Sequence, residues 1–332
     1  MDSPGGAAAG RRTATVGRYR REPLPAGLRY ESETWRAPPA ALDPARQLHG
    51  HSIRPAAVVR FDCLGAEDGT LKGVKRVRLN LAYDGTDFHG WQVQPRIPTI
   101  QGELETALSS FHNAPVRVYA AGRTDAGVHA AGQVVHYDAP TPRVHSKLLR
   151  AMESMLPDAI RVTGARDVPD TFHARFRATE RVYVYNLLRV RDPFMERFGL
   201  RPAVSWNPED LAAVAQRFPG RRDWSLFATQ PDPGESTICE LRRVSVHSTP
   251  FGARVVVVAD RFLRRMVRTL VGTMLQAASG HISASELEEM LQGRADRAGV
   301  PVAPQGLALA RVRYELDTNE DKPISTVWGD IP

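Results

Sequence analysis

The order of strand-like and helix-like segments constrains the fold of this chain more than any other feature of its sequence. From residue 75 onward, apolar residues at every second position predict strands, and apolar residues at helical spacing predict helices. Each half has the order strand, helix, strand, strand, helix, strand, which is the ferredoxin-like order, although no sequence identity links the halves. Strands are expected at 77–83, 116–118, 134–137, 159–165, 179–190, 241–247, 254–260 and 307–314, and helices at 99–111, 144–156, 208–218 and 261–277.

This pattern predicts an α+β fold of two ferredoxin-like halves, built on antiparallel sheets with helices on one face and an active-site cleft between them. The predicted halves are residues 75–170 and 171–315, and residues 316–332 form a polar tail. Residues 1–74 hold seven prolines and nine glycines without a sustained period, so we expect a mostly disordered extension. This extension is a basic tail, a targeting segment or the product of an upstream start codon, and its acidic residues argue against an organelle transit peptide.

The net charge of +7 is a weak argument for a nucleic-acid partner. Residues 1–75 hold 12 Lys/Arg and 8 Asp/Glu, which leaves 32 and 29 for the rest of the chain. Any argument for RNA therefore depends on local clusters of charge. Cys63 and Cys239 lack the spacing of a metal knuckle, and no apolar run is long enough to span a membrane. We expect a cytosolic protein with reduced cysteines and no membrane contact.

A glycine-rich loop at 120–133, AAGRTDAGVHAAGQ, carries Asp125 between two strand-like runs. Its glycines allow another backbone or a ligand to approach closely. Arg123 lies two residues before Asp125, which places both side chains on one face if the loop is extended. A hairpin with a surface ion pair is the plain structural interpretation, since exposed pairs are common and stabilise little.

Several separated stretches occur together in one order along the chain. They are LAYDGTDFHGWQ at 81–92, TIQGELETAL at 99–108, GRTDAGVHA at 122–130, FHARFRATERVYVY at 172–185 and FLRRMVRTLVGTM at 262–274. Together they resemble the bacterial tRNA pseudouridine synthase A family, over roughly residues 75–315. The resemblance implies an isomerase that works without a cofactor on uridines of the tRNA anticodon stem-loop, at tRNA positions 38–40, as a homodimer.

The resemblance also implies three catalytic residues. Asp125 is the nucleophile or stabiliser, acting at C1′ of the ribose or at the base ring. Arg268 is expected to pair with Asp125, because a nearby guanidinium keeps a partly buried carboxylate ionised and oriented. Tyr183 matches the family's active-site tyrosine, which lies against the reacting base and is proposed to act as a base. On pattern alone, Tyr183 is equally a strand residue that packs on the core.

Further residues are candidates for substrate binding. Arg123 is a candidate wedge or phosphate contact during base flipping, or a local loop hydrogen bond. His173 lies in a polar connection, where RNA contact and structural packing are equal alternatives. By resemblance, Leu307 lines the uracil pocket, while Ala308 replaces an aromatic residue that is usual in relatives. The predicted helix 261–277 places four arginines on one face: Arg261, Arg264, Arg265 and Arg268. We expect them either to bind RNA phosphate or to form a solvated basic face.

Two alternatives to the isomerase remain open at this stage. His129, His136 and His145 lie near one another in sequence, but without a matching acidic set we expect them to pack or form hydrogen bonds and not to bind metal. A hydrolase that uses these histidines and a metal would lose activity to chelators. A tRNA-binding protein of the same fold without catalysis would tolerate Asp125→Asn.

Overall fold

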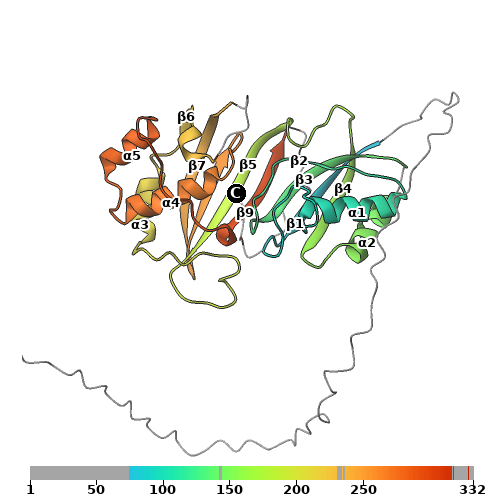
Figure 1. Cartoon of the computed structure of the whole chain (residues 1–332), viewed down its shortest axis with the longest axis horizontal. Helices are drawn as coiled ribbons and strands as arrows, with labels where there is room; N and C mark the ends of the chain where they lie inside the picture. Colours follow the sequence, from blue (N-terminus) through green and yellow to red (C-terminus); the bar gives the residue numbers. More distant parts are fainter. Residues whose placement is uncertain are drawn as a thin grey trace, which may run out of the picture. The chain divides into compact units, whose positions relative to one another are not determined.

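The computed structural model describes residues 75–141, 144–229, 234, 236–315, 317 and 328. The predictions for residues 1–74, and for the tail apart from residues 317 and 328, lie outside the described residues. Within the described part the chain forms one mixed sheet with helices packed against it (Figure 1). The strands are β1 (Lys75–Tyr83), β2 (Tyr119–Ala120), β3 (His129–Ala139), β4 (Ile160–Val168), β5 (Ala178–Leu188), β6 (Gly220–Asp223), β7 (Ile238–Thr249), β8 (Gly252–Ala259) and β9 (Leu307–Tyr314).

The sheet has nine strands in the order β4-β1-β3-β9-β5-β8-β7-β6, with β2 also paired to β3. The first half contributes β4-β1-β3-β2 and the second half contributes β9-β5-β8-β7. Both halves therefore arrange their four predicted strands in the same spatial order: fourth, first, third, second. The α+β class and the repeat are therefore observed. The prediction of antiparallel sheets holds within each half, but the two halves share one mixed sheet, because β9 pairs antiparallel with β5 on one side and runs parallel to β3 on the other. Pairing on both sides satisfies backbone groups that an edge strand would leave open.

Five α-helices and two short 3₁₀ turns complete the described fold. They are α1 (Ile100–His112), α2 (His145–Met155), α3 (Pro208–Ala215), η1 (Ser225–Phe227), α4 (Met266–Ala278), α5 (Ala284–Leu291) and η2 (Pro304–Gly306). The sequence prediction missed β6 and α5, although Ser283 and Glu286 form a capping box that starts α5 and is visible as a sequence signature. The predicted helix 261–277 was wrong at its start, because Arg265 has a left-handed φ of 60° and helical geometry begins at Met266.

One hydrophobic core lies between the helices and the sheet across both halves. It joins Leu104 of α1 and Leu79 of β1 to Leu270 of α4 and Val257 of β8, so the helices of both halves cover the same face of the sheet. On the opposite face, alternate residues of the central strands form a smaller apolar cluster, in agreement with the period of two along a strand. Its members are Ala131, Val182, Val184, Val256, Val258, Ala308, Ala310 and Trp328.

The three histidines pack or form hydrogen bonds, as predicted. His129 is 1% exposed and contacts the Gln305 carbonyl oxygen through Nε2 at 3.1 Å. His136 is 2% exposed and accepts a hydrogen bond from the Ala174 backbone N–H at 3.1 Å. His145 contacts Asp167 at 3.0 Å on the surface. Within the described ranges, no three His, Cys, Asp or Glu side chains are grouped so that they could hold a metal ion.

None of the helices described is long and apolar enough to cross a membrane.

The buried His136 predicts a specific acid dependence of stability. Burial, followed by the nearby His173 and Arg76, lowers the pKa of His136 from 6.5 to about 4. Because the folded pKa lies below the unfolded one, the stabilisation is present above about pH 6.5 and is lost as the pH falls toward about 4. Wild type should lose about 1.4 kcal/mol more unfolding free energy per pH unit than His136→Gln between about pH 6 and 4.5. Urea unfolding across this range measures both slopes, and equal slopes would contradict the assignment.

Candidate active site

Asp125 lies on the loop between β2 and β3 and faces Arg268 of α4. The Arg268 Nη1 atom lies 3.4 Å from Asp125 Oδ2, and the side chains are 14% and 27% exposed respectively. The pair was predicted from sequence and is present in the structure. Ion pairs with this much solvent access stabilise a fold by about 1 kcal/mol or less. The pair therefore orients the carboxylate and contributes little to folding, and it leaves Asp125 accessible to a reacting group.

Arg268 is held in place from its other side by the segment that leads to η2. Its Nε donates to the Val302 carbonyl oxygen at 2.7 Å, and the Val302 backbone N–H donates to the Arg268 carbonyl oxygen at 3.1 Å. These two bonds fix the direction of the guanidinium. Asp125 precedes β3 of the first half while Arg268 belongs to the second half, so the pair joins the two repeats.

Backbone contacts hold the Asp125 loop from the side of the first half. The Trp91 N–H donates to the Thr124 carbonyl oxygen at 3.0 Å, and the Tyr83 hydroxyl lies 2.8 Å from Thr124 Oγ1. Gly90 has a left-handed φ of 88°, and a Cβ there would lie 2.8 Å from the Thr124 carbonyl oxygen and 3.1 Å from the Asp125 carbonyl carbon. The connection 84–98 therefore braces the Asp125 loop, with Trp91 buried in the core.

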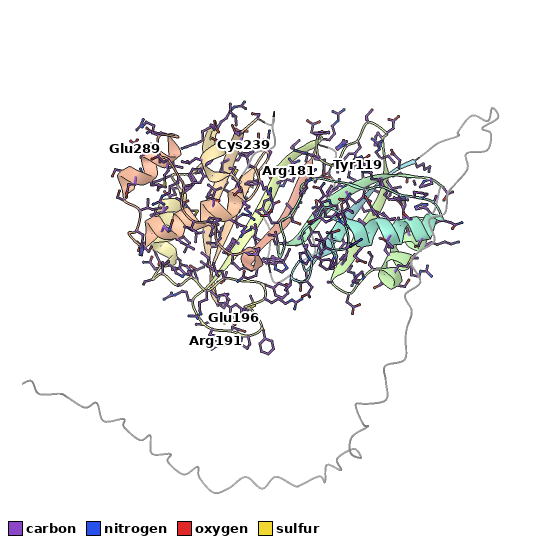
Figure 2. The ribbon with its side chains drawn as sticks, viewed as in Figure 1. Tyr119, Arg181, Arg191, Glu196, Cys239 and Glu289 are labelled. Atoms are coloured by element: carbon purple, nitrogen blue, oxygen red, sulfur yellow. The ribbon has the colours of Figure 1, made fainter. Side chains whose placement is uncertain are left out.

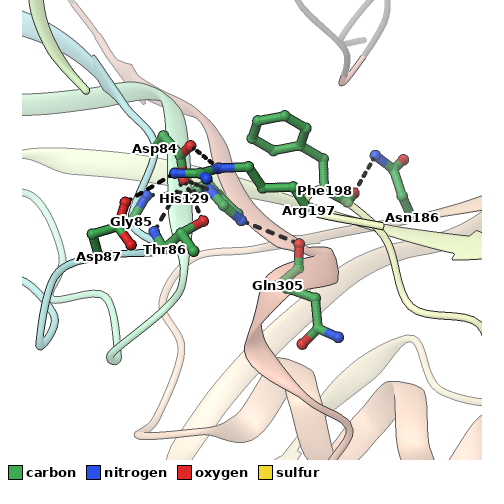
Figure 3. A network of polar contacts seen from close by, with 9 residues as sticks. All are labelled: Asp84, Gly85, Thr86, Asp87, His129, Asn186, Arg197, Phe198 and Gln305. Carbon is green, nitrogen blue, oxygen red and sulfur yellow. Dashed lines mark hydrogen bonds and ion pairs between the residues drawn. The ribbon is translucent and has the colours of Figure 1, made fainter. Parts of the chain in front are cut away.

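A second brace of polar contacts joins this connection to the second half (Figure 3). Arg197 donates to Asp84 at 2.6 Å and to Asp87 at 3.0 Å. His129 Nδ1 lies 3.2 Å from the Gly85 backbone nitrogen and 3.1 Å from Asp84 Oδ1, and its Nε2 lies 3.1 Å from the carbonyl oxygen of Gln305 in η2. Burial, the largest effect, lowers the pKa of His129 despite the nearby Asp84 carboxylate.

Arg181 of β5 is a positioning residue that the sequence analysis missed (Figure 2). Its side chain is 8% exposed and donates only to backbone carbonyls in the hydrogen bonds that the structure describes. Nη2 donates to Ala121 at 3.0 Å and to Arg175 at 2.7 Å, while Nη1 donates to Asp260 at 2.6 Å. One guanidinium thus ties the start of the Asp125 loop to the β4–β5 connection and to the segment before α4. An arginine in an alternating strand gives no sequence signal for such burial.

Tyr183 lies on β5 next to the same loop. Its ring meets Phe262 edge-on with centroids 5.0 Å apart, and a Cβ on Gly122 would lie 3.9 Å from its hydroxyl oxygen. Burial raises the pKa of Tyr183 well above its ordinary value of 10, and the nearby Tyr83 and Asp125 raise it further. The hydroxyl is therefore neutral near neutral pH. Tyr183 therefore lies near Asp125, which contacts Arg268, and its role in catalysis stays a prediction.

Leu307 and Ala308 point to opposite faces of β9. Leu307 pairs in register with Tyr185 and is buried on the face that carries Tyr183, whereas Ala308 is buried in the cluster on the far face. Alanine at position 308, where relatives usually have an aromatic residue, therefore does not alter the face of the sheet that carries Tyr183.

The predicted basic face is not present. Only Arg268 lies within α4; Arg264 and Arg265 are exposed in the turn before it, and Arg261 lies further back. The Arg264 carbonyl oxygen accepts from the Thr229 N–H at 3.0 Å, which holds this turn out of helical geometry. Arg123 is exposed on the Asp125 loop. These side chains are accessible to an anionic partner, but they do not form one helical stripe.

Comparison with known proteins assigns the chain to a family. A family model described as tRNA pseudouridine synthase matches residues 81–177 and 214–315, more than half of the chain. The chain belongs to the tRNA pseudouridine synthase family. The first matched segment contains Asp125 and the second contains Arg268.

The matches to curated relatives cover nearly the whole length of each relative. The tRNA pseudouridine synthase A of Exiguobacterium sp. is 34% identical over 73% of this chain and 99% of that protein. The protein of the same name from Chlorobium phaeovibrioides is 39% identical over 72% and 99%, and that from Burkholderia thailandensis is 35% identical over 77% and 98%. Among solved structures, a chain in the crystal structure of a Cbf5-Nop10-Gar1 complex aligns with a TM-score of 0.30 at 10% identity, over 70% of this chain and 57% of that one, which is too low to bear on the fold.

The close approach of Gly90 to the Asp125 loop predicts that a side chain at position 90 lowers activity beyond its effect on stability. Gly90→Ala adds a methyl group against the Thr124 carbonyl, whereas Gly280→Ala, at a similar left-handed φ of 77°, meets nothing within 4 Å. Both variants should lose about 1–2 kcal/mol of unfolding free energy from the left-handed backbone. Only Gly90→Ala should also lower pseudouridine formation on tRNA, by about a hundredfold, because it displaces the reacting carboxylate. Equal activity of the two folded variants would show that Gly90 does not position Asp125.

Proposed function

We propose that this chain converts uridine to pseudouridine in tRNA, with Asp125 as the essential carboxylate. The observation that carries the proposal is the accessible Asp125 carboxylate held 3.4 Å from the fixed guanidinium of Arg268. In this reaction the bond from C1′ to N1 of uracil breaks, the base turns, and a bond forms from C1′ to C5. The proton on C5 leaves and N1 gains one, so no atom is added to or lost from the RNA.

Breaking a glycosidic bond develops positive charge on the ribose, which a neighbouring carboxylate stabilises or traps. Attack of Asp125 at C1′ and attack at the base ring are both compatible with its position. Arg268, 3.4 Å away, orients the carboxylate toward the reacting group. Glycosidases that hydrolyse a bond from a sugar carbon to oxygen commonly use a second carboxyl group as an acid. A single positioned carboxylate suits rearrangement better than hydrolysis.

Tyr183 completes the proposed site as a neutral aromatic side chain beside the base. Because burial keeps its hydroxyl protonated near neutral pH, a role in accepting a proton requires that it give up its own proton in the same step. Its ring is fixed by Phe262, and its hydroxyl is within reach of the Asp125 loop. We assign Leu307 to the same pocket, where it is buried on the Tyr183 face of the sheet.

The proposed substrate is the anticodon stem-loop, with uridines at tRNA positions 38–40 as targets. The exposed Arg123, Arg264 and Arg265 are positioned to contact RNA phosphate near the site, and His173 lies in the connection that Arg181 ties to the Asp125 loop. Phosphate contacts of this kind give affinity without reading sequence. We further propose that the protein acts in the cytosol as a homodimer and requires no cofactor.

The experiment that tests the proposal measures pseudouridine on an unmodified tRNA transcript with EDTA present, for wild type, Asp125→Asn and Asp158→Asn. Asp158 is an exposed carboxylate and serves as the matched control. Asp125→Asn should lower product formation by at least about a thousandfold while it binds tRNA as tightly as the control. No product from wild type despite tRNA binding would leave a tRNA-binding protein without catalysis, and release of free uracil only when EDTA is omitted would favour a metal-dependent hydrolase.

Arg268 gives a second, independent test of the site. Arg268→Gln removes the charge beside Asp125 and the bond to Val302, so kcat should fall by about a hundredfold or more. Arg268→Lys keeps the charge and should retain more activity than the glutamine variant, although lysine lacks the planar fork of donors. Single-turnover kinetics at saturating tRNA measure this ranking. If the two variants were equally active, the charge of Arg268 would not be what supports Asp125.

A further inference from the structure

Four aromatic rings form a continuous array beside the Asp125 loop and end in two exposed side chains. Tyr119 lies against His136 with centroids 5.1 Å apart and nearly parallel planes, His136 against His173 at 4.6 Å, and His173 against Phe176 at 4.3 Å. The end members, Phe176 and Tyr119, are 75% and 44% exposed. Exposed rings of this size are costly to leave in water, and an aromatic surface held in this way commonly marks a binding site.

The array is fixed by hydrogen bonds from the chain around it. The Ala174 N–H donates to His136 Nδ1 at 3.1 Å, and the Tyr314 hydroxyl donates to the Ala174 carbonyl oxygen at 2.7 Å. The N–H groups of Arg175 and Phe176 donate to His173 Nδ1, at 3.2 Å and 3.4 Å. Each Nδ1 is therefore an acceptor, and both imidazoles are neutral rings in one orientation. The surface is ordered before any partner arrives, so a partner would not bear that ordering entropy.

Positive charge flanks both exposed rings. The guanidinium carbon of Arg117 lies 5.8 Å from the centroid of the Tyr119 ring, and that of Arg175 lies 5.8 Å from the centroid of the Phe176 ring. Both arginines are exposed at the surface. Flat apolar faces with guanidinium groups beside them match the two parts of a nucleotide, since the base stacks on the ring and the phosphate contacts the cation.

The array is tied directly to the proposed site. The same Nη2 of Arg181 donates to the carbonyl of Ala121, which begins the Asp125 loop, and to the carbonyl of Arg175, which lies between His173 and Phe176. Tyr119 is two residues before Ala121, on the strand that leads into the Asp125 loop. The array is therefore held against the start of the Asp125 loop by one buried guanidinium.

We propose that Phe176 and Tyr119 stack an unpaired base of the tRNA substrate next to the target uridine. Only an unpaired base presents a free face, and a target base that leaves its stack exposes the neighbouring base. The array then replaces part of the stacking that the RNA loses when the target turns into the site. This proposal rests on the proposed function for the identity of the RNA, and it adds a base-binding position that is separate from Asp125.

Equilibrium binding to an unmodified tRNA transcript tests the proposal, with every protein carrying Asp125→Asn so that no substrate is consumed. Phe176→Ala should weaken binding roughly fivefold to a hundredfold, as expected for the loss of one stacked base. The slope of affinity against salt should stay unchanged, because no charge is removed. The matched control is Phe194→Ala, which truncates a phenylalanine that is 86% exposed elsewhere on the surface.

Two further variants separate stacking from damage to the fold. Phe176→Trp keeps an aromatic face and should bind tRNA at least as tightly as the protein that carries Asp125→Asn alone. Tyr119→Phe should bind with the same affinity as that protein, whereas Tyr119→Ala should bind more weakly. Binding by Phe176→Ala that equals the Phe194→Ala control would overturn the proposal, as would a Trp variant as weak as the Ala variant. Because binding is measured without turnover, this result does not depend on whether the wild-type protein forms pseudouridine.

Discussion

The arrangement of the site depends on how tightly the Asp125 loop is held by the backbone around it. The ion pair with Arg268 is too accessible to water to fix the loop alone. The close approach of Gly90 on one side, and the carbonyl contacts of the buried Arg181 on the other, leave the loop little freedom. The parallel contact between β3 and β9, and that of β9 with β5, then keeps the loop before β3 near the strand that carries Tyr183. Preorganisation of this kind lets one carboxylate act without reorganisation during the reaction.

Alternation of apolar residues was sufficient to predict most of the strands and the repeated order of elements, because each buried strand must place every second side chain in the core. The pairing of Asp125 with Arg268 followed from the resemblance and from the need of a partly buried carboxylate for a cation. The geometry adds that Arg268 is fixed by Val302 and that Tyr183 is a neutral phenol. Both follow from tertiary contacts that no local pattern contains.

The errors have the same origin. Periodicity assigned Arg261, Arg264 and Arg265 to α4, but the left-handed backbone of Arg265 and the bond from Thr229 are set by tertiary packing. Arg181 follows the alternation of β5 like any solvent-facing residue, yet it is buried among carbonyls of three segments. The joining of two repeats into one sheet also depends on a contact between β3 and β9, which are far apart in sequence. Long-range contacts of this type decide the site, while local patterns decide the elements.

The central claim is that one carboxylate moves a base within the RNA without releasing it. The most direct measurement uses a tRNA transcript labelled with tritium at uracil C5 and carbon-14 in the uracil ring, incubated with the wild-type protein. We expect one tritium released to water for each pseudouridine formed, with all carbon-14 retained in the RNA. Release of free carbon-14 uracil, or full retention of tritium together with product, would contradict it.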